Sequence, residues 1–144
     1  MRLLIAFVFL FLSSILAAGE VSNPAASTSV VITATSPQFK ISLSDLQADP
    51  SKKFVYVRIA KVINPDKISL GFAVHYQPND CKSIYLGNFA LFPADNPGEF
   101  IVPTQGKVQQ TGSISITMEM PESTKPLALV QVEIAEIRFV NALR

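Results

Sequence analysis

The sequence has one cysteine, one histidine, no tryptophan and almost no excess of either charge. A single cysteine excludes a disulfide framework within the chain and a cysteine-rich zinc site. A single histidine excludes every metalloenzyme centre that needs two or three imidazole ligands. Twelve basic residues against eleven acidic ones leave a formal net charge of +1, which excludes nucleic-acid binding or membrane binding by bulk charge.

The sequence also lacks the short motifs of common enzymes. It contains no nucleophile elbow, no phosphate-binding Walker loop and no dinucleotide-binding glycine fingerprint. Glu133 and Glu136 could be taken for a carboxylate pair, but exposed charges on an edge strand explain them. We therefore expect a protein without catalytic activity and without a bound cofactor.

Residues 1–19 have the parts of a secretory signal peptide. Arg2 precedes an apolar run from Leu3 to Leu12, and small residues occupy Ala17 and Gly19, the −3 and −1 positions of a cut after Gly19. The apolar segment would make about 24 Å of helix, which is shorter than the roughly 30 Å hydrocarbon core of a bilayer. We expect a secreted or periplasmic protein with no stable membrane anchor after cleavage.

Residues 20–38 are rich in Ser, Thr, Ala and Pro and are predicted to be a leader, with a first strand within 29–34 as an open alternative. From residue 39 to 144 short alternating segments are separated by prolines and by turn residues such as Asn64-Pro65-Asp66. This pattern predicts one all-β domain, an antiparallel sandwich of about seven or eight strands. The predicted strands are residues 39–43, 54–62, 68–76, 84–92, 99–102, 113–120 and 127–140.

Two segments fit this pattern less simply. Residues 43–50 could form one helical turn before Pro50 stops it. In the last segment, Val130, Val132 and Ile134 share one parity, whereas Ile137 and Phe139 share the other. Its β-branched residues favour a strand with a bulge near Ala135 and Glu136 over a helix.

His75, Cys81, Met118 and Met120 are the candidate soft-metal ligands. Such a set suits Cu(I), although blue copper would need a second histidine. The two methionines share a strand face with Ile114 and Ile116, which favours a place in the core, and His75 is expected to be solvated or hydrogen-bonded. The favoured interpretation is no metal site, with a soft-metal carrier as an alternative function.

Cys81 lies in a predicted turn between Pro78 and Ser83. An odd cysteine in an exported protein is either buried and inert or free to pair with another chain, so a disulfide-linked dimer through Cys81 is an open alternative. The aromatic residues of the middle strands are expected to fill the core, with Tyr76 and Tyr85 as candidates for a binding patch.

Several stretches resemble the C-terminal β-sandwich domain that follows the copper domain of tyrosinases and polyphenol oxidases. The resemblance covers roughly residues 54–140, including an aromatic-x-Gly-x-Phe-x-x-Phe pattern, and is carried by Phe54–Val57, Tyr85–Phe92, Phe100–Val102, Ile116–Pro121 and Val130–Phe139. It implies a module that does no chemistry and packs over a catalytic domain. The six copper-binding histidines of that family are absent, so the oxidase activity is not implied.

The sequence thus predicts an exported, non-catalytic binding or accessory module with a protein partner, such as a copper-oxidase-like enzyme that it covers or assists. A structural protein that assembles through edge strands or Cys81 is the alternative from a different class.

Overall fold

The computed structural model describes residues 29–79, 81–122 and 129–142 of the chain. These residues form eight strands and no helix, so none of them could cross a membrane as a helix. The predicted signal segment and most of the leader lie outside the described residues. The strands are β1 (Val30–Thr33), β2 (Gln38–Ser42), β3 (Phe54–Ile63), β4 (Gly71–Gln77), β5 (Ile84–Ala90), β6 (Gly98–Pro103), β7 (Ser113–Glu119) and β8 (Gln131–Val140).

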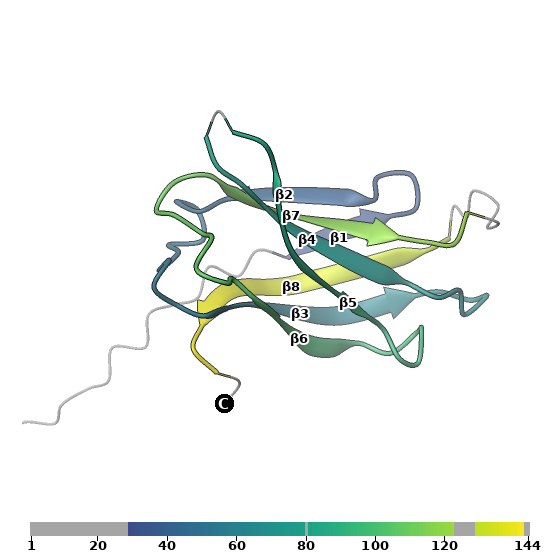
Figure 1. The fold of residues 1–144 in the computed structure, drawn as a ribbon. Helices are drawn as coiled ribbons and strands as arrows, with labels where there is room; N and C mark the ends of the chain where they lie inside the picture. The colour runs from purple at the N-terminus through teal and green to yellow at the C-terminus, as the bar shows by residue number, and fades with distance from the viewer. Residues whose placement is uncertain (1–28, 80, 123–128, 143–144) are drawn as a thin grey trace, which may run out of the picture.

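The strands form two four-stranded antiparallel sheets, ordered β1-β8-β3-β6 and β2-β7-β4-β5 (Figure 1). This arrangement confirms the predicted all-β sandwich and its strand number. Most consecutive strands change sheets, since only β4 and β5 are neighbours in both sequence and sheet. β1 contacts β2 and β5 contacts β6, which closes the sandwich at its two edges.

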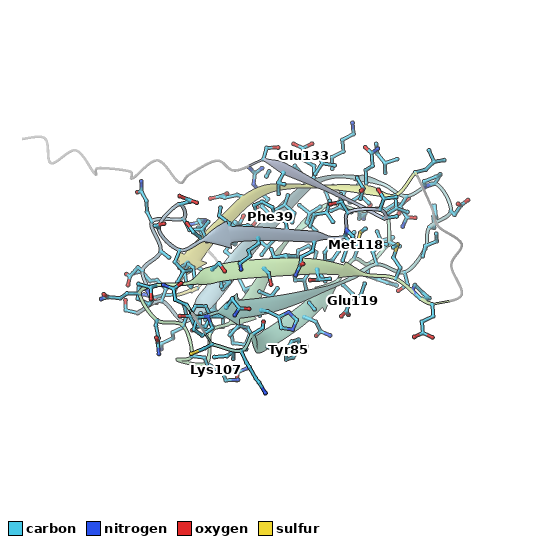
Figure 2. All side chains as sticks on the ribbon, turned by 90° about the horizontal axis from the view of Figure 1, so that it is seen from above. Phe39, Tyr85, Lys107, Met118, Glu119 and Glu133 are labelled. Carbon is cyan, nitrogen blue, oxygen red and sulfur yellow. The ribbon has the colours of Figure 1, made fainter. Side chains whose placement is uncertain are left out.

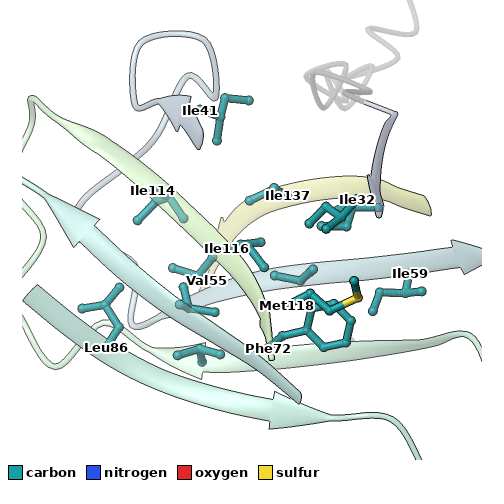
Figure 3. Close-up of a cluster of buried hydrophobic side chains, with 14 of the residues drawn as sticks. Ile32, Ile41, Val55, Ile59, Phe72, Leu86, Ile114, Ile116, Met118 and Ile137 are labelled. Atoms are coloured by element: carbon teal, nitrogen blue, oxygen red, sulfur yellow. The ribbon is translucent and has the colours of Figure 1, made fainter. Parts of the chain in front are cut away.

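Alternation along each strand sends one set of side chains between the sheets. Phe72 of β4 is fully buried there, and so are Ile114 and Ile116 of β7 (Figure 3). Val74 and Tyr76 of β4 are likewise fully buried. Each large apolar side chain buried in this way contributes roughly 1.5–3 kcal/mol. The core therefore holds the two sheets together and leaves their outer faces free for other contacts.

Two opposed bulges interrupt the central pair of the first sheet. Arg58 pairs with Glu136 and Ile59 pairs with Ile134, so Ala135 is an extra residue of β8, and Ala60 is an extra residue of β3. The bulge lets residues of both parities in β8 point into the core. The predicted strand with a bulge near Ala135 and Glu136 is confirmed.

Asn64 terminates β3 with its side chain. Its Nδ2 donates to the carbonyls of Ile68 and Ala94, at 2.8 and 3.0 Å, and its Oδ1 accepts the Ile68 amide at 3.1 Å. These bonds occupy the backbone of Ile68 and tie this turn to the loop after β5. For that reason β4 begins at Gly71 and not at residue 68 as predicted.

Residues 43–47 make a hydrogen-bonded turn and no helix, with Leu46 N–H bonded to the Ser42 carbonyl at 3.2 Å. Leu43 and Leu46 are both buried and cover one end of the core. At the β5–β6 edge, the ring of Phe89 stacks on Phe72 and Phe100, with centroids 5.0 and 4.4 Å away.

Candidate binding faces of the sandwich

The outer face of the sheet β2-β7-β4-β5 carries mostly uncharged side chains, with Lys40 on β2 and Glu119 at the end of β7 as its charged residues, and we call it the polar face. The antiparallel registers align its side chains in rows that cross all four strands. The central strand β7 presents mainly small hydroxyl residues, and the central strand β4 presents Ala73 together with the longer His75 and Gln77. The polar face comprises Gln38, Lys40, Ser42, Gly71, Ala73, His75, Gln77, Tyr85, Asn88, Ala90, Ser113, Ser115, Thr117 and Glu119.

Tyr85 is the large aromatic side chain of the polar face and is 49% exposed (Figure 2). The ring of His75 meets it edge-on, with a centroid distance of 5.4 Å and an interplanar angle of 61°. His75 lies opposite Ser115 of β7, and Ser115 lies opposite Lys40 of β2. A single row across the sheet therefore carries an ammonium group, a hydroxyl, an imidazole and a phenol.

A hollow of about 410 Å³ lies at the end of the polar face where β4 finishes. Gln77 is held there because its carboxamide donates a hydrogen bond to the Cys81 carbonyl. Gly112 supports this corner from the neighbouring loop. Its φ is +117°, and an added Cβ would lie 2.4 Å from the Gln77 carbonyl oxygen. The hollow is lined by Lys40, Gln77, Pro78, Asn79 and Ser113.

The outer face of the sheet β1-β8-β3-β6 is different, and we call it the arginine face. It carries charged side chains of both signs together with aliphatic and aromatic residues. It comprises Val31, Thr33, Phe54, Tyr56, Arg58, Lys61, Ile63, Glu99, Ile101, Pro103, Gln131, Glu133, Glu136, Arg138 and Val140.

Glu136 organises the charged half of the arginine face. Its carboxylate oxygens lie 2.9 Å from Arg138 Nε and 3.5 Å from Arg58 Nε. The guanidinium of Arg138 also lies 4.4 Å above the ring centroid of Tyr56, which is 3% exposed. Burial, and then the hydrogen bond and charge of Glu99, raise the pKa of Tyr56.

The other half of the arginine face contains a small notch of about 110 Å³ between β1, β8 and β3. Val31 and Ile63 form its apolar wall and are 53% and 39% exposed. Lys61, Gln131 and Glu133 complete it. Glu133 also accepts a hydrogen bond from the Ser29 hydroxyl at 2.9 Å.

The structure separates Tyr76 from Tyr85. Tyr76 points into the core with no exposed surface, and its hydroxyl donates to the Thr111 carbonyl at 2.6 Å. Tyr85 points outward because a bulge in β5 shifts the register, so that His75 pairs with Tyr85 and Tyr76 pairs with Ile84. The predicted patch of both tyrosines is therefore wrong for Tyr76, whereas Tyr85 is accessible.

The four candidate soft-metal ligands are also not brought together. Met118 is 3% exposed between the sheets, and Met120 packs against the edge of the core. His75 lies on the opposite side of that sheet, and Cys81 is an exposed free thiol in the loop after β4. Among the residues described, no group of three or more His, Cys, Asp or Glu side chains could hold a metal ion.

Glu133 and Glu136 do not lie on an edge strand as expected, because β8 is enclosed by β1 and β3. The bulge at Ala135 places both carboxylates on the arginine face, although they are three residues apart. The group of Tyr56, Arg58, Glu136 and Arg138 was not predicted from the sequence. Alternation in the sequence shows which residues of a predicted strand are polar, but it does not show which residues of other strands lie beside them.

A scan against protein-family models and a search of curated proteins find no match to this chain.

Proposed function

We propose that this protein is a non-catalytic binding module that docks a partner protein through its arginine face. The observation that carries the proposal is Arg138, which lies 4.4 Å above the Tyr56 ring and 2.9 Å from Glu136. Arginine is enriched at the centres of protein interfaces, and a guanidinium that is already held in place loses little conformational freedom on binding. Such a face suits a protein surface better than a small substrate.

The notch indicates what kind of side chain the partner protein presents to this face. Val31 and Ile63 expose apolar surface beside Lys61 and Glu133, whose opposite charges balance. An apolar side chain of the partner that enters this notch would remove this surface from water, with polar contacts around it. The partner is thus a protein with an apolar anchor in a largely neutral surface.

The accessory role follows from the resemblance of residues 54–140 to the C-terminal domain of tyrosinases and polyphenol oxidases. In that family the domain covers the copper domain, so the proposed partner is a copper-oxidase-like enzyme. The apolar segment of residues 1–19 supports export of the chain to meet such a partner.

Affinity capture from the exported fraction of the host tests this proposal. We expect stoichiometric recovery of one copper oxidase, lost with Arg138→Glu or Val31→Lys and retained with Lys40→Gln on the polar face. Equal recovery by all variants, or recovery of no oxidase, would contradict the proposal. Circular dichroism of each variant controls for folding.

Self-assembly is the second candidate, favoured by β1. This strand is an edge of its sheet and has no charged residue or proline, the usual features that prevent edge-to-edge pairing. A dimer that pairs β1 would also cover Val31. Light scattering after size exclusion, in reducing buffer, distinguishes this candidate: a monomer at high concentration rules it out, and a dimer lost on Val31→Lys supports it. Non-reducing electrophoresis separately detects a dimer through Cys81.

A further inference from the structure

The polar face forms a second site, separate from the arginine face, and we propose that it binds an acidic polysaccharide, a chain of sugar rings that carry carboxylate groups. The inference does not depend on the partner protein. It rests on three features that lie together on one sheet: an exposed ring, a field of uncharged hydrogen-bonding groups, and a cation beside a hollow.

Tyr85 provides the surface for a sugar ring. Its ring is 49% exposed, and the edge contact with His75 at 5.4 Å supports its orientation. An aromatic ring offers an apolar face with a polar tip, which suits the C–H face of a sugar whose rim is polar. Because His75 and Tyr85 are paired on adjacent strands, the support comes from the sheet itself and not from a loop.

The groups between Tyr85 and the opposite edge strand can both donate and accept hydrogen bonds. Asn88 and Gln38 carry carboxamides on the two edge strands, and Thr117 carries a hydroxyl between them, whereas Ser115 is only 7% exposed. Sugar hydroxyls likewise donate and accept, so each can pair with either kind of group. The buried core of a stable protein interface is enriched in large apolar residues, which the middle of this face lacks.

Lys40 supplies the charge that selects an acidic sugar. Its ammonium borders the hollow of about 410 Å³, together with the carboxamides of Gln77 and Asn79 and the hydroxyl of Ser113. In the described part of the chain no carboxylate lines this hollow and none forms an ion pair with Lys40. A carboxylate of the ligand would find a cation and several hydrogen-bond donors there.

The distance between the two ends of the row indicates an oligomer. Tyr85 and Lys40 lie three strands apart, which corresponds to about 14 Å between their backbones. One bound sugar that stacks on Tyr85 does not reach Lys40 at that distance. A chain of sugars can use both contacts at once, and each contact then strengthens the other.

The proposal is tested by isothermal titration calorimetry. The protein, as processed by its host, is titrated with a tetramer of galacturonic acid. The methyl ester of the same tetramer keeps the rings and hydroxyls and removes the charge. We expect the acid to bind, the ester to bind about tenfold more weakly, and Lys40→Gln to reduce binding of the acid by a similar factor. Lys61→Gln on the arginine face is the matched control and should leave binding unchanged.

Substitutions of Tyr85 distinguish recognition of a sugar ring from simple attraction between charges. Tyr85→Ala should weaken binding of the acid about tenfold, and Tyr85→Phe should retain most of it because the ring remains. Polyglutamate, which has carboxylates without sugar rings, should not bind. No heat with the acid tetramer, equal binding of polyglutamate, or no effect of Tyr85→Ala would each overturn the proposal. Loss of oxidase capture would not affect it, because that readout concerns the other face.

Discussion

The two outer faces of the sandwich come from the same alternation of inward and outward residues, yet they are unlike in chemistry. On the arginine face, long charged side chains lie on the central strands β3 and β8 and contact one another. On the polar face, the central strands β4 and β7 carry mostly uncharged residues such as Ser115 and His75, and no ion pair joins them in the described part of the chain.

This difference shows how the pairing among outward side chains decides what a sheet can bind. Long central side chains that already pair with each other present a prearranged surface for another protein. On the polar face, Lys40 and Tyr85 stand on opposite edge strands, so a ligand that contacts both must cross β7 and β4. Substitutions on each face test whether the two faces are independent in stability and in binding.

The largest expected effect concerns the loop under the polar face. Gly112→Ala would place a Cβ 2.4 Å from the Gln77 carbonyl oxygen at a φ of +117°, so the backbone must shift. We expect a loss of roughly 3 kcal/mol in the free energy of unfolding, measured with urea. Gly106→Ala is the control. Its φ is +68° with no atom within 4 Å of the added Cβ, and it should cost about 1–2 kcal/mol. Equal costs for the two variants would contradict the clash.

On the arginine face, Glu136→Gln removes the carboxylate that both Arg58 and Arg138 contact. Because the arginine side chains are 44% and 46% exposed, solvent screens these pairs and the expected loss is about 1 kcal/mol. Glu119→Gln, at the end of β7, should stay within about 0.5 kcal/mol of the parent. Added salt should reduce the difference between the variants, and a difference that grows with salt would refute the ionic explanation.

The two ring contacts on the outer faces should differ in strength. A double-mutant cycle for Tyr56 and Arg138 should give a coupling of about 1 kcal/mol, because a cation lies over the ring face. The cycle for His75 and Tyr85 should give about 0.5 kcal/mol, because that edge contact is exposed on the polar face. A reversed order would mean that the polar face is the more rigid of the two.

The smallest expected effect is a dependence on alkaline pH that belongs to the arginine face. Because the pKa of Tyr56 is raised in the folded protein, the unfolded chain loses this proton first as the pH rises. The contribution of Tyr56 to stability is present below about pH 10 and is lost as the pH rises through the folded pKa. Urea unfolding of Tyr56→Phe should show a shallower alkaline decline than the parent. Tyr85→Phe should keep the parent's decline, because Tyr56 is intact in that variant.

Most strands could be located from the sequence because alternation is a local property of the chain. Residues 113–120 were predicted as a strand, and β7 spans Ser113–Glu119 with Ile114 and Ile116 inside. The change of parity between Ile134 and Ile137 likewise predicted the bulge that the pairing of β3 with β8 shows at Ala135. The predicted β4 is too long at its start. The Asn64 side chain forms hydrogen bonds with the backbone of Ile68, which holds that residue in a turn.

The candidate sites were less predictable because they depend on which strands are neighbours. Tyr76 and Tyr85 flank the same turn in sequence, but the register of β4 and β5 sends one inside and the other outside. The row from Lys40 to Tyr85 joins residues forty-five positions apart. No local sequence pattern predicts that alignment. The same is true of the ion pairs that Arg58 and Arg138 form with Glu136.

The sequence by itself determined the class of the fold, the approximate places of the strands and the absence of common catalytic motifs, since these follow from local periodicity and composition. Only the tertiary structure decided the sheet order, the enclosed position of β8 and the contrast between the two outer faces. The physical reason is that hydrophobic burial specifies which side of a strand faces the core, whereas the neighbours on the outer side follow from long-range pairing between strands.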